Sequence, residues 1–173
     1  TSCIGKGWTM NIDSRVMHND RFMMIQMPDS SIEVFEKQND VWTSAKEGSL
    51  RNKIQEDSET GFITMLTFDK KKYVYNQRGN LVSISDSNQN TLSIQYIDNT
   101  EVIDNIQTTG DKTLKFEYCD NKICSITDHI GRTMHYCYDG ELLTKVEDRN
   151  HGITTYTYNE NGYMDSITDA NGK

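Results

Sequence analysis

The sequence predicts an all-β protein, built as an extended antiparallel sheet of successive β-hairpins. Segments 113–118 (TLKFEY), 133–138 (TMHYCY) and 153–158 (ITTYTY) are rich in Thr, Tyr and Phe, with aromatic residues two positions apart. This is the period and chemistry of a half-buried strand. Between such segments lie short polar groups such as DNK, DG and NENG, whose Gly and Asn residues suit hairpin turns. The pattern recurs along residues 73–173, so each copy predicts one hairpin.

Three kinds of position mark the repeat. A tyrosine lies early in each copy: Tyr75, Tyr96, Tyr118, Tyr138 and Tyr158. An aspartate closes every copy except the second, where Thr108 takes its place: Asp86, Asp128, Asp148 and Asp169. A Gly or Asn follows, at intervals of 20, 21, 21 and 20 residues: Asn90, Gly110, Gly131, Gly152 and Gly172. Units of this size bury their apolar faces by stacking on neighbours.

Each marked position has an expected structural role. The Asp side chain can accept backbone N–H bonds at the start of a turn, and the Gly or Asn that follows can take a left-handed conformation. The tyrosines are expected to stack with aliphatic side chains on one face of the sheet. Those aliphatic positions are, in copy order, Leu81 and Ile84, Ile106, Ile123 and Ile126, Leu142 and Val146, and Ile167.

The residues before the repeat predict an irregular β segment. Strands are expected at 21–27, 31–36, 41–43, 62–68 and 73–75. Pro28 falls between the first two of these, where it would start a turn. Segment 44–60 is charged and without a clean period, so it predicts a surface loop or a short helical turn. We therefore divide the chain into an N-terminal β segment, 1–72, and a hairpin array, 73–173, which form one continuous sheet without a linker.

Composition argues against several classes of function. The formal net charge is −8 at pH 7 and the sequence pI is about 4.9, which disfavours a phosphate-binding face and hence nucleic-acid binding. The sequence contains no apolar run long enough for a signal peptide core or a membrane span. It does not begin with Met, and we expect it to be part of a longer protein.

No arrangement of residues predicts catalysis, a metal or a cofactor. The histidines are expected to be surface residues: His18, His129, His135 and His151. The repeat places its closing Asp near two of them, but the sequence offers no other partner for a general base or a metal site. The repeat carboxylates recur once per hairpin, which suits turn capping better than a glycosidase pair. Their period also differs from that of calcium-binding β-helices. We therefore expect a protein that is not an enzyme and has no cofactor.

The four cysteines are Cys3, Cys119, Cys124 and Cys137. Cys119 and Cys124 flank a hairpin turn, so a disulfide across it is conceivable. Free or partly buried thiols on strands are the alternative, and we take this interpretation because a free cysteine packs as a small apolar residue. The redox compartment stays undecided.

The repeat resembles the YD repeat of the rearrangement-hotspot (Rhs) family, which also occurs in insecticidal toxin-complex proteins and teneurins. The resembling pattern is Tyr-x-Tyr-Asp/Asn, Gly-x-Leu and Ile-x-Asp-x-x-Gly over residues 73–173, with the best copies at 136–152 and 156–172. The opening residues 5–8 (GKGW) and the stretch 13–16 (DSRV) are similar to the segment that leads into the repeats of bacterial Rhs proteins. Thr108 and Asn90 depart from the pattern.

The resemblance implies a structural function. The chain would be a non-catalytic segment of a β-cage that encloses or presents a C-terminal toxin or effector, in a secreted or cell-surface protein. Its partners would be further repeats and the effector of the same polypeptide, and exposed strand edges could make an isolated fragment self-associate. The alternative is a cell-surface adhesion or carbohydrate-binding module that uses the repeat aromatics, with the tyrosine rings stacking on sugars.

Overall fold

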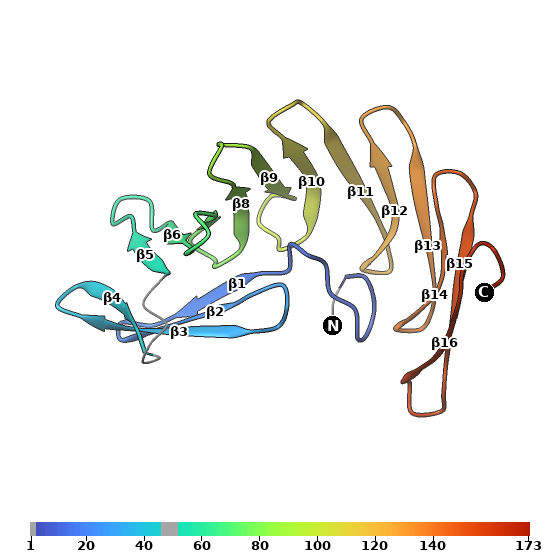
Figure 1. Cartoon of the computed structure of the whole chain (residues 1–173), viewed down its shortest axis with the longest axis horizontal. Helices are drawn as coiled ribbons and strands as arrows, with labels where there is room; N and C mark the ends of the chain where they lie inside the picture. Colours follow the sequence, from blue (N-terminus) through green and yellow to red (C-terminus); the bar gives the residue numbers. More distant parts are fainter. Residues whose placement is uncertain (1–2, 46–51) are drawn as a thin grey trace. The chain divides into compact units, whose positions relative to one another are not determined.

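The computed structural model describes residues 3–45 and 52–173, whose regular elements are all β-strands (Figure 1). The chain divides into two compact units: a central unit, Met10–Asp111, and a terminal unit formed by Thr1–Thr9 with Lys112–Lys173. The prediction of an all-β fold made of antiparallel hairpins is confirmed. The predicted division between residues 72 and 73 falls within the central unit and stays a prediction. The expectation of one continuous sheet was wrong, because the strands between Arg15 and Ser44 form a four-stranded sheet of their own.

The central unit begins with a four-stranded antiparallel sheet in the order β1 (Arg15–His18), β2 (Phe22–Gln26), β3 (Ile32–Gln38) and β4 (Val41–Ser44). Alternation decides which side chains are buried, because successive residues of a strand point to opposite faces. The buried face carries Val16, Met23, Ile25, Phe35 and Trp42, each less than 8% exposed. The turn predicted at Pro28 is confirmed: Met27 N–H donates to Ser31 O, and Ser30 N–H donates to Met27 O.

Six further strands of the central unit follow as consecutive antiparallel neighbours: β5 (Lys53–Glu56), β6 (Ile63–Leu66), β7 (Lys72–Tyr75), β8 (Leu81–Ser85), β9 (Thr91–Tyr96) and β10 (Ile103–Thr108). Strand β5 corrects the prediction of a loop or helical turn over 44–60, of which residues 46–51 lie outside the described residues. The strand pairs along its whole length with β6, from Lys53 opposite Leu66 to Glu56 opposite Ile63. Pairing with a neighbouring strand outweighed a weak local pattern.

Strand β1 lies against the hairpin turn that joins β7 and β8. Val16 N–H donates to Gly79 O at 2.9 Å, and Arg15 forms an isolated antiparallel bridge with Asn80. Beside this contact, the buried hydroxyls of Ser14 and Tyr75 share a hydrogen bond of 2.8 Å. These bonds join a strand before the repeat to the first hairpin of the repeat.

The terminal unit contains the strands β11 (Thr113–Cys119), β12 (Lys122–Asp128), β13 (Thr133–Asp139), β14 (Leu142–Glu147), β15 (Ile153–Tyr158) and β16 (Met164–Thr168), again consecutive antiparallel neighbours. The start of the chain crosses their hairpins. Ile123 N–H donates to Cys3 O at 2.8 Å, and Lys6 N–H donates to Glu141 O at 2.7 Å. Farther along, the Trp8 ring meets Tyr156 edge-on at 5.0 Å.

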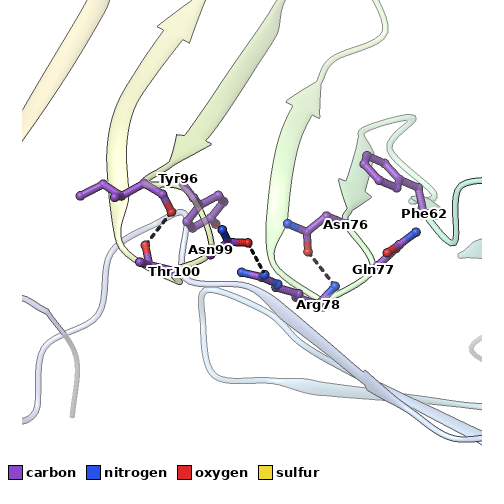
Figure 2. A pocket seen from close by; sticks show the side chains of 8 residues that line it. Phe62, Asn76, Gln77, Arg78, Tyr96, Asn99 and Thr100 are labelled. Carbon is purple, nitrogen blue, oxygen red and sulfur yellow. Dashed lines mark hydrogen bonds between the residues drawn. The ribbon is translucent and has the colours of Figure 1, made fainter.

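The loops between strands are closed by side chains that accept backbone N–H bonds. At the β7–β8 turn, Asn76 Oδ1 accepts from the N–H group of Arg78 at 3.0 Å (Figure 2). It also accepts from the N–H group of Asn80 at 3.1 Å. Gly79 has φ of +77°, as expected for a type I turn followed by a left-handed residue. Asn159 makes the same pair of bonds in the β15–β16 loop, to Asn161 and Tyr163.

Candidate functional site: the repeat positions

Each repeat tyrosine lies at a β-bulge opposite one aliphatic residue. The pairs are Tyr75 with Leu81, Tyr96 with Ile103, Tyr118 with Ile123, Tyr138 with Leu143 and Tyr158 with Met164. In the first four pairs the aliphatic partner is buried, with exposed fractions of 0%, 7%, 0% and 1%. A bulge adds one residue to one strand and turns the chain locally. The repeat thus sets one buried aliphatic side chain in each of these four hairpins.

The bulge corrects one sequence assignment. We expected Leu142 to be the apolar repeat position of the fourth copy, but Leu142 pairs with Asp139 at the end of the hairpin and Leu143 faces Tyr138. Leu143 is 1% exposed, whereas Leu142 is half-buried. In the second copy, Ile103 takes the corresponding place, and the predicted Ile106 is also buried.

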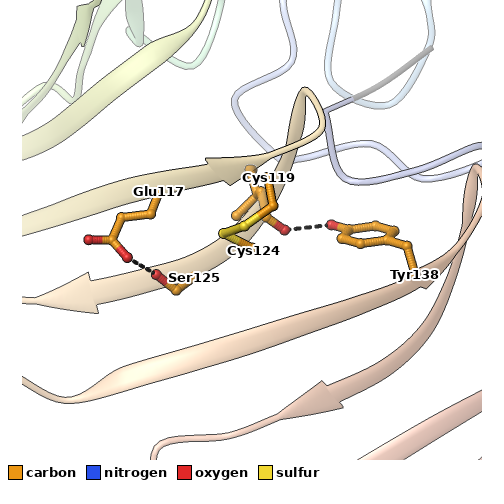
Figure 3. The surroundings of a disulfide bond; sticks show 6 residues. Glu117, Cys119, Cys124, Ser125 and Tyr138 are labelled. Carbon is orange, nitrogen blue, oxygen red and sulfur yellow. Dashed lines mark hydrogen bonds between the residues drawn. A yellow bond between two sulfur atoms is a disulfide. The ribbon is translucent and has the colours of Figure 1, made fainter.

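Tyrosine hydroxyls connect neighbouring hairpins. Tyr138 Oη donates to the carbonyl of Ile123 at 2.8 Å, and Tyr158 Oη donates to that of Leu143 at 2.7 Å. Tyr96 makes the same bond to Leu81 at 2.8 Å. Each acceptor is the bulge-pair residue of the preceding hairpin. Figure 3 shows the Tyr138 hydroxyl directed at the hairpin that carries Cys119 and Cys124. We call these three bonds the tyrosine clasps.

The predicted aspartates close the turns. In each case Oδ1 accepts from the N–H groups two and four residues later, at 2.7–3.0 Å: Asp86 from Asn88 and Asn90, Asp128 from Ile130 and Arg132, Asp148 from Asn150 and Gly152, and Asp169 from Asn171 and Lys173. One carboxylate therefore satisfies two backbone donors that the loop would leave unpaired. Where Thr108 replaces Asp, its carbonyl still accepts from Asp111 N–H.

The left-handed residue of each turn lies three positions after the closing residue. Gly131 and Gly172 have φ of +84° and +75°, as predicted. In the other copies the prediction was one position wrong: the positive φ belongs to Gln89, Asp111 and His151 rather than to Asn90, Gly110 and Gly152. Gly152 is instead needed for space, because a Cβ there would lie 2.8 Å from Asp148 Oδ2.

The turn bonds favour the ionised form of the aspartates. Desolvation raises the pKa of Asp128, but hydrogen bonds from the Arg132 side chain and from the N–H groups of Arg132 and Ile130 outweigh it and lower the pKa to about 2. The N–H groups of Gly152 and Asn150 lower the pKa of Asp148, and those of Lys173 and Asn171 lower the pKa of Asp169.

Stability is therefore expected to fall in acid. A carboxylate with a lowered folded-state pKa stabilises the fold above its unfolded pKa, and this contribution disappears as the pH falls through the folded value. For Asp128 this window runs from the ordinary pKa of 3.8 down to about 2. Urea unfolding between about pH 5 and pH 2 should show a shallower pH dependence in Asp128→Asn than in the wild type. The control Asp165→Asn, in an exposed residue of β16, should keep the wild-type slope; equal slopes in all three proteins would contradict the role of Asp128.

The structure contains a disulfide that the sequence did not favour. Cys119 and Cys124 are bonded across the β11–β12 hairpin (Figure 3). Cys3 and Cys137 are outside any disulfide. The expectation of free thiols was therefore wrong for this pair. A two-residue loop, Asp120–Asn121, with φ of 50° and 63°, folds the strand back tightly. The two Cα atoms come to 5.6 Å, within the range a disulfide requires.

Reduction of this disulfide is expected to lower the free energy of unfolding by about 2 kcal/mol, the value that loop entropy predicts for so short a loop. Urea unfolding with and without a phosphine reductant measures the difference. The double variant Cys119→Ser/Cys124→Ser should match the reduced wild type, and Cys137→Ser, at an exposed thiol, should leave stability unchanged. No change on reduction would exclude a stabilising role for the bond.

The tyrosine rings do not form an exposed row. Tyr75 is fully buried, and the four later repeat tyrosines are half-buried. The four histidines are exposed, as expected. Within residues 3–45 and 52–173, no group of three or more His, Cys, Asp or Glu residues is placed to hold a metal ion. In the same part of the chain, no helix has the length and apolarity to cross a membrane.

These features define a β-hairpin repeat protein. Its repeated side-chain contacts, at the bulges, the clasps and the Asp turns, hold the hairpins and loops together. The family model for the Teneurin YD-shell matches residues 58–173. The chain belongs to the Teneurin YD-shell family and is a structural segment of such a shell, which confirms the YD-repeat assignment.

One solved structure with a similar chain is the Photorhabdus luminescens Tc holotoxin pore. The match covers 90% of this chain at 12% sequence identity, with a TM-score of 0.43. The matched region is 11% of the length of the chain in that structure. Among curated proteins, none matches the sequence.

Proposed function

We propose that this chain is a non-catalytic wall segment of a larger YD shell, which encloses or presents a C-terminal toxin or effector of the same polypeptide. The tyrosine clasps are the observation that carries the proposal. They tie a hairpin to the one before it, in addition to the hydrogen bonds between strands. A wall assembled from marginal hairpins needs such links, because an isolated hairpin is barely stable in water.

The state of the carboxylates supports a structural role. A catalytic acid needs a pKa near the working pH, but turn bonds lower the pKa of Asp148 and Asp169. The Oδ1 atoms of these residues already accept two backbone N–H groups each. We therefore propose that they hold the loops and take no part in a reaction. A secreted or cell-surface location belongs to the same proposal.

The enclosure is tested by limited proteolysis of the intact parent polypeptide, followed by mass spectrometry. Protection of a C-terminal segment is expected in the wild type and should be reduced in the variant Tyr138→Phe/Tyr158→Phe, which loses two clasps. Tyr163→Phe, at a ring that is 71% exposed, is the matched control. If the C-terminal segment is cleaved equally in all three proteins, the enclosure proposal fails.

Strand β16 supports the expected partner, further repeats of the same polypeptide. In the described structure it has one neighbour, β15, and all of its residues are exposed, with Met164 at 42% and Ile167 at 53%. An exposed strand edge of this kind pairs readily with another strand. We expect the 173-residue chain alone to form dimers or larger species, as measured by light scattering over a concentration series. A monomer at the highest concentration would contradict this.

The alternative, a carbohydrate-binding row of repeat tyrosines, receives less support. That function needs exposed ring faces in a line, whereas these rings are at most half exposed. The hydroxyls of Tyr96, Tyr138 and Tyr158 are bonded to backbone carbonyls, where they join hairpins.

A further inference from the structure

A pocket of about 290 Å³ lies between two neighbouring loops of the central unit. One loop joins β7 to β8 and the other joins β9 to β10 (Figure 2). The lining residues are Phe62, Asn76, Gln77, Arg78, Tyr96, Ile97, Asn99 and Thr100. The volume is near the lower end of the range for small-molecule sites, about 300–1,000 Å³, and suits a ligand of one ring. Asn76 closes the β7–β8 turn and Tyr96 makes a clasp, but neither role requires Phe62 or the side chain of Arg78 in the lining.

The pocket is rich in hydrogen-bond donors. Arg78 Nη2 donates to Asn99 Oδ1 at 3.1 Å, and Figure 2 shows the Arg78 side chain between Asn99 and Asn76. Among the described residues, the other guanidinium N–H groups of Arg78 bond to none. The side-chain oxygen of Asn76 is occupied by the turn N–H groups, which leaves its Nδ2 to donate outward. Gln77 differs, because its Nε2 already donates to Thr60 O at 2.6 Å. The oxygens of Asn76 and Asn99 are engaged within the protein, while N–H groups of Arg78 and Asn76 are available, so the pocket suits a ligand rich in acceptors.

The charge of the lining selects an anion. Arg78 is the single ionisable side chain among the eight lining residues apart from the phenol of Tyr96, and the lining contains no carboxylate. This is unusual for a chain with a formal net charge of −8. A guanidinium presents a planar fork that matches a carboxylate with two parallel hydrogen bonds.

Aromatic and aliphatic surface completes the pocket. Phe62 is 38% exposed and Ile97 is 46% exposed. The Tyr96 ring is half-buried and is held by the bond from its hydroxyl to Leu81 O. Rigid aromatic rings provide contact area at low conformational entropy cost. They suit the C–H face of a pyranose, whose edge carries hydroxyl acceptors and donors for the amides of Asn76, Gln77 and Asn99.

We propose that this pocket binds a carboxylate-bearing pyranose, the chemistry shared by uronic acids and sialic acids. Arg78 pairs with the carboxylate, the Asn amides contact ring hydroxyls, and Phe62 and Tyr96 flank the ring. The site is independent of the enclosure proposed above, because all of its residues belong to the central unit and it uses no C-terminal segment.

The proposal is tested with the 173-residue chain by saturation-transfer NMR and by titration. The probes are D-glucuronic acid and N-acetylneuraminic acid, with D-glucose and inorganic phosphate as comparisons. We expect binding of at least one acidic sugar with a Kd in the millimolar range, about what a one-ring ligand attains. The acid that binds shows whether the ligand is a uronic acid or a sialic acid. Failure of both acids to bind, or equal binding of glucose or phosphate, would overturn the proposal.

Variants locate the site. Arg78→Ala should weaken binding by about tenfold or more, as expected for loss of a charge-assisted pair, and Arg78→Lys should give an intermediate value because the fork is lost. Arg149→Ala removes the same charge from an exposed residue outside the pocket and should change Kd less than about twofold. Equal affinity in Arg78→Ala and the wild type would overturn the assignment, provided that the backbone spectrum shows a folded protein.

Discussion

Gly79→Ala is expected to destabilise the central unit by about 2–5 kcal/mol, through two separate effects. Gly79 has φ of +77°, and its Cβ would lie 2.0 Å from the carbonyl oxygen of Val16. A left-handed conformation costs an L-residue about 1–2 kcal/mol, and forced overpacking adds about 1–3 kcal/mol. The contact cannot relax cheaply, because Val16 N–H is bonded to Gly79 O in the same place.

Gly131→Ala is the matched control. Gly131 has φ of +84°, and a Cβ at this position would meet nothing within 4 Å, so the variant should lose only the left-handed contribution of about 1–2 kcal/mol. Trp42 lies in the central unit and Trp8 in the terminal unit. Single-tryptophan variants of each protein therefore let urea unfolding be followed separately in each unit. If Gly79→Ala lost no more than Gly131→Ala, the close approach of β1 to the β7–β8 turn would be wrong.

Leu143→Ala is expected to reduce the free energy of unfolding of the terminal unit by about 2–5 kcal/mol, the usual loss when a buried leucine leaves a cavity. The Leu143 side chain is 1% exposed and lies opposite Tyr138 across the bulge. Its carbonyl also accepts the clasp from Tyr158, so movement of the backbone would disturb the next hairpin. Trp8, which contacts Tyr156 and Tyr158, reports the transition.

The neighbouring residue provides the control for Leu143. Leu142→Ala removes the same atoms from a half-buried side chain at the hairpin end and should lose about 1 kcal/mol or less. The pair of variants distinguishes the observed register from the one expected from sequence, which placed Leu142 at the apolar position. A larger loss in Leu142→Ala than in Leu143→Ala would contradict the bulge.

The fold class and much of the turn chemistry could be predicted because both depend on local patterns. Aromatic alternation in segments such as 153–158 indicates strands, and an Asp before a short polar loop indicates a turn that it can close. It was harder to predict which residue within a turn takes the left-handed conformation. His151, and not Gly152, takes the left-handed conformation. Asp148 bonds the N–H groups two and four residues later, so the position of the aspartate sets the shape of the turn.

Side-chain facing was less predictable, because a bulge shifts it by one residue. Nothing local distinguishes Leu142 from Leu143. The bulge does, because Thr144 is the extra residue between the Cys137–Lys145 and Tyr138–Leu143 pairs. The Arg78 pocket likewise needs two loops about 20 residues apart, Asn76–Asn80 and Ile97–Val102. A spacing near the repeat period could have suggested that they are neighbours, but not which side chains meet between them.

Local chemistry in the chain was sufficient to specify hairpins, closing aspartates and membership of the YD-repeat class, since these features repeat within a few tens of residues. The tertiary structure settled the contacts between distant segments: Trp8 with Tyr158, 150 residues away, Val16 with Gly79, and the tyrosine clasps between hairpins. Such contacts depend on where the folded strands bring backbone carbonyls and ring edges together. A carbonyl is present at every residue, so the sequence does not show which one a tyrosine hydroxyl will reach.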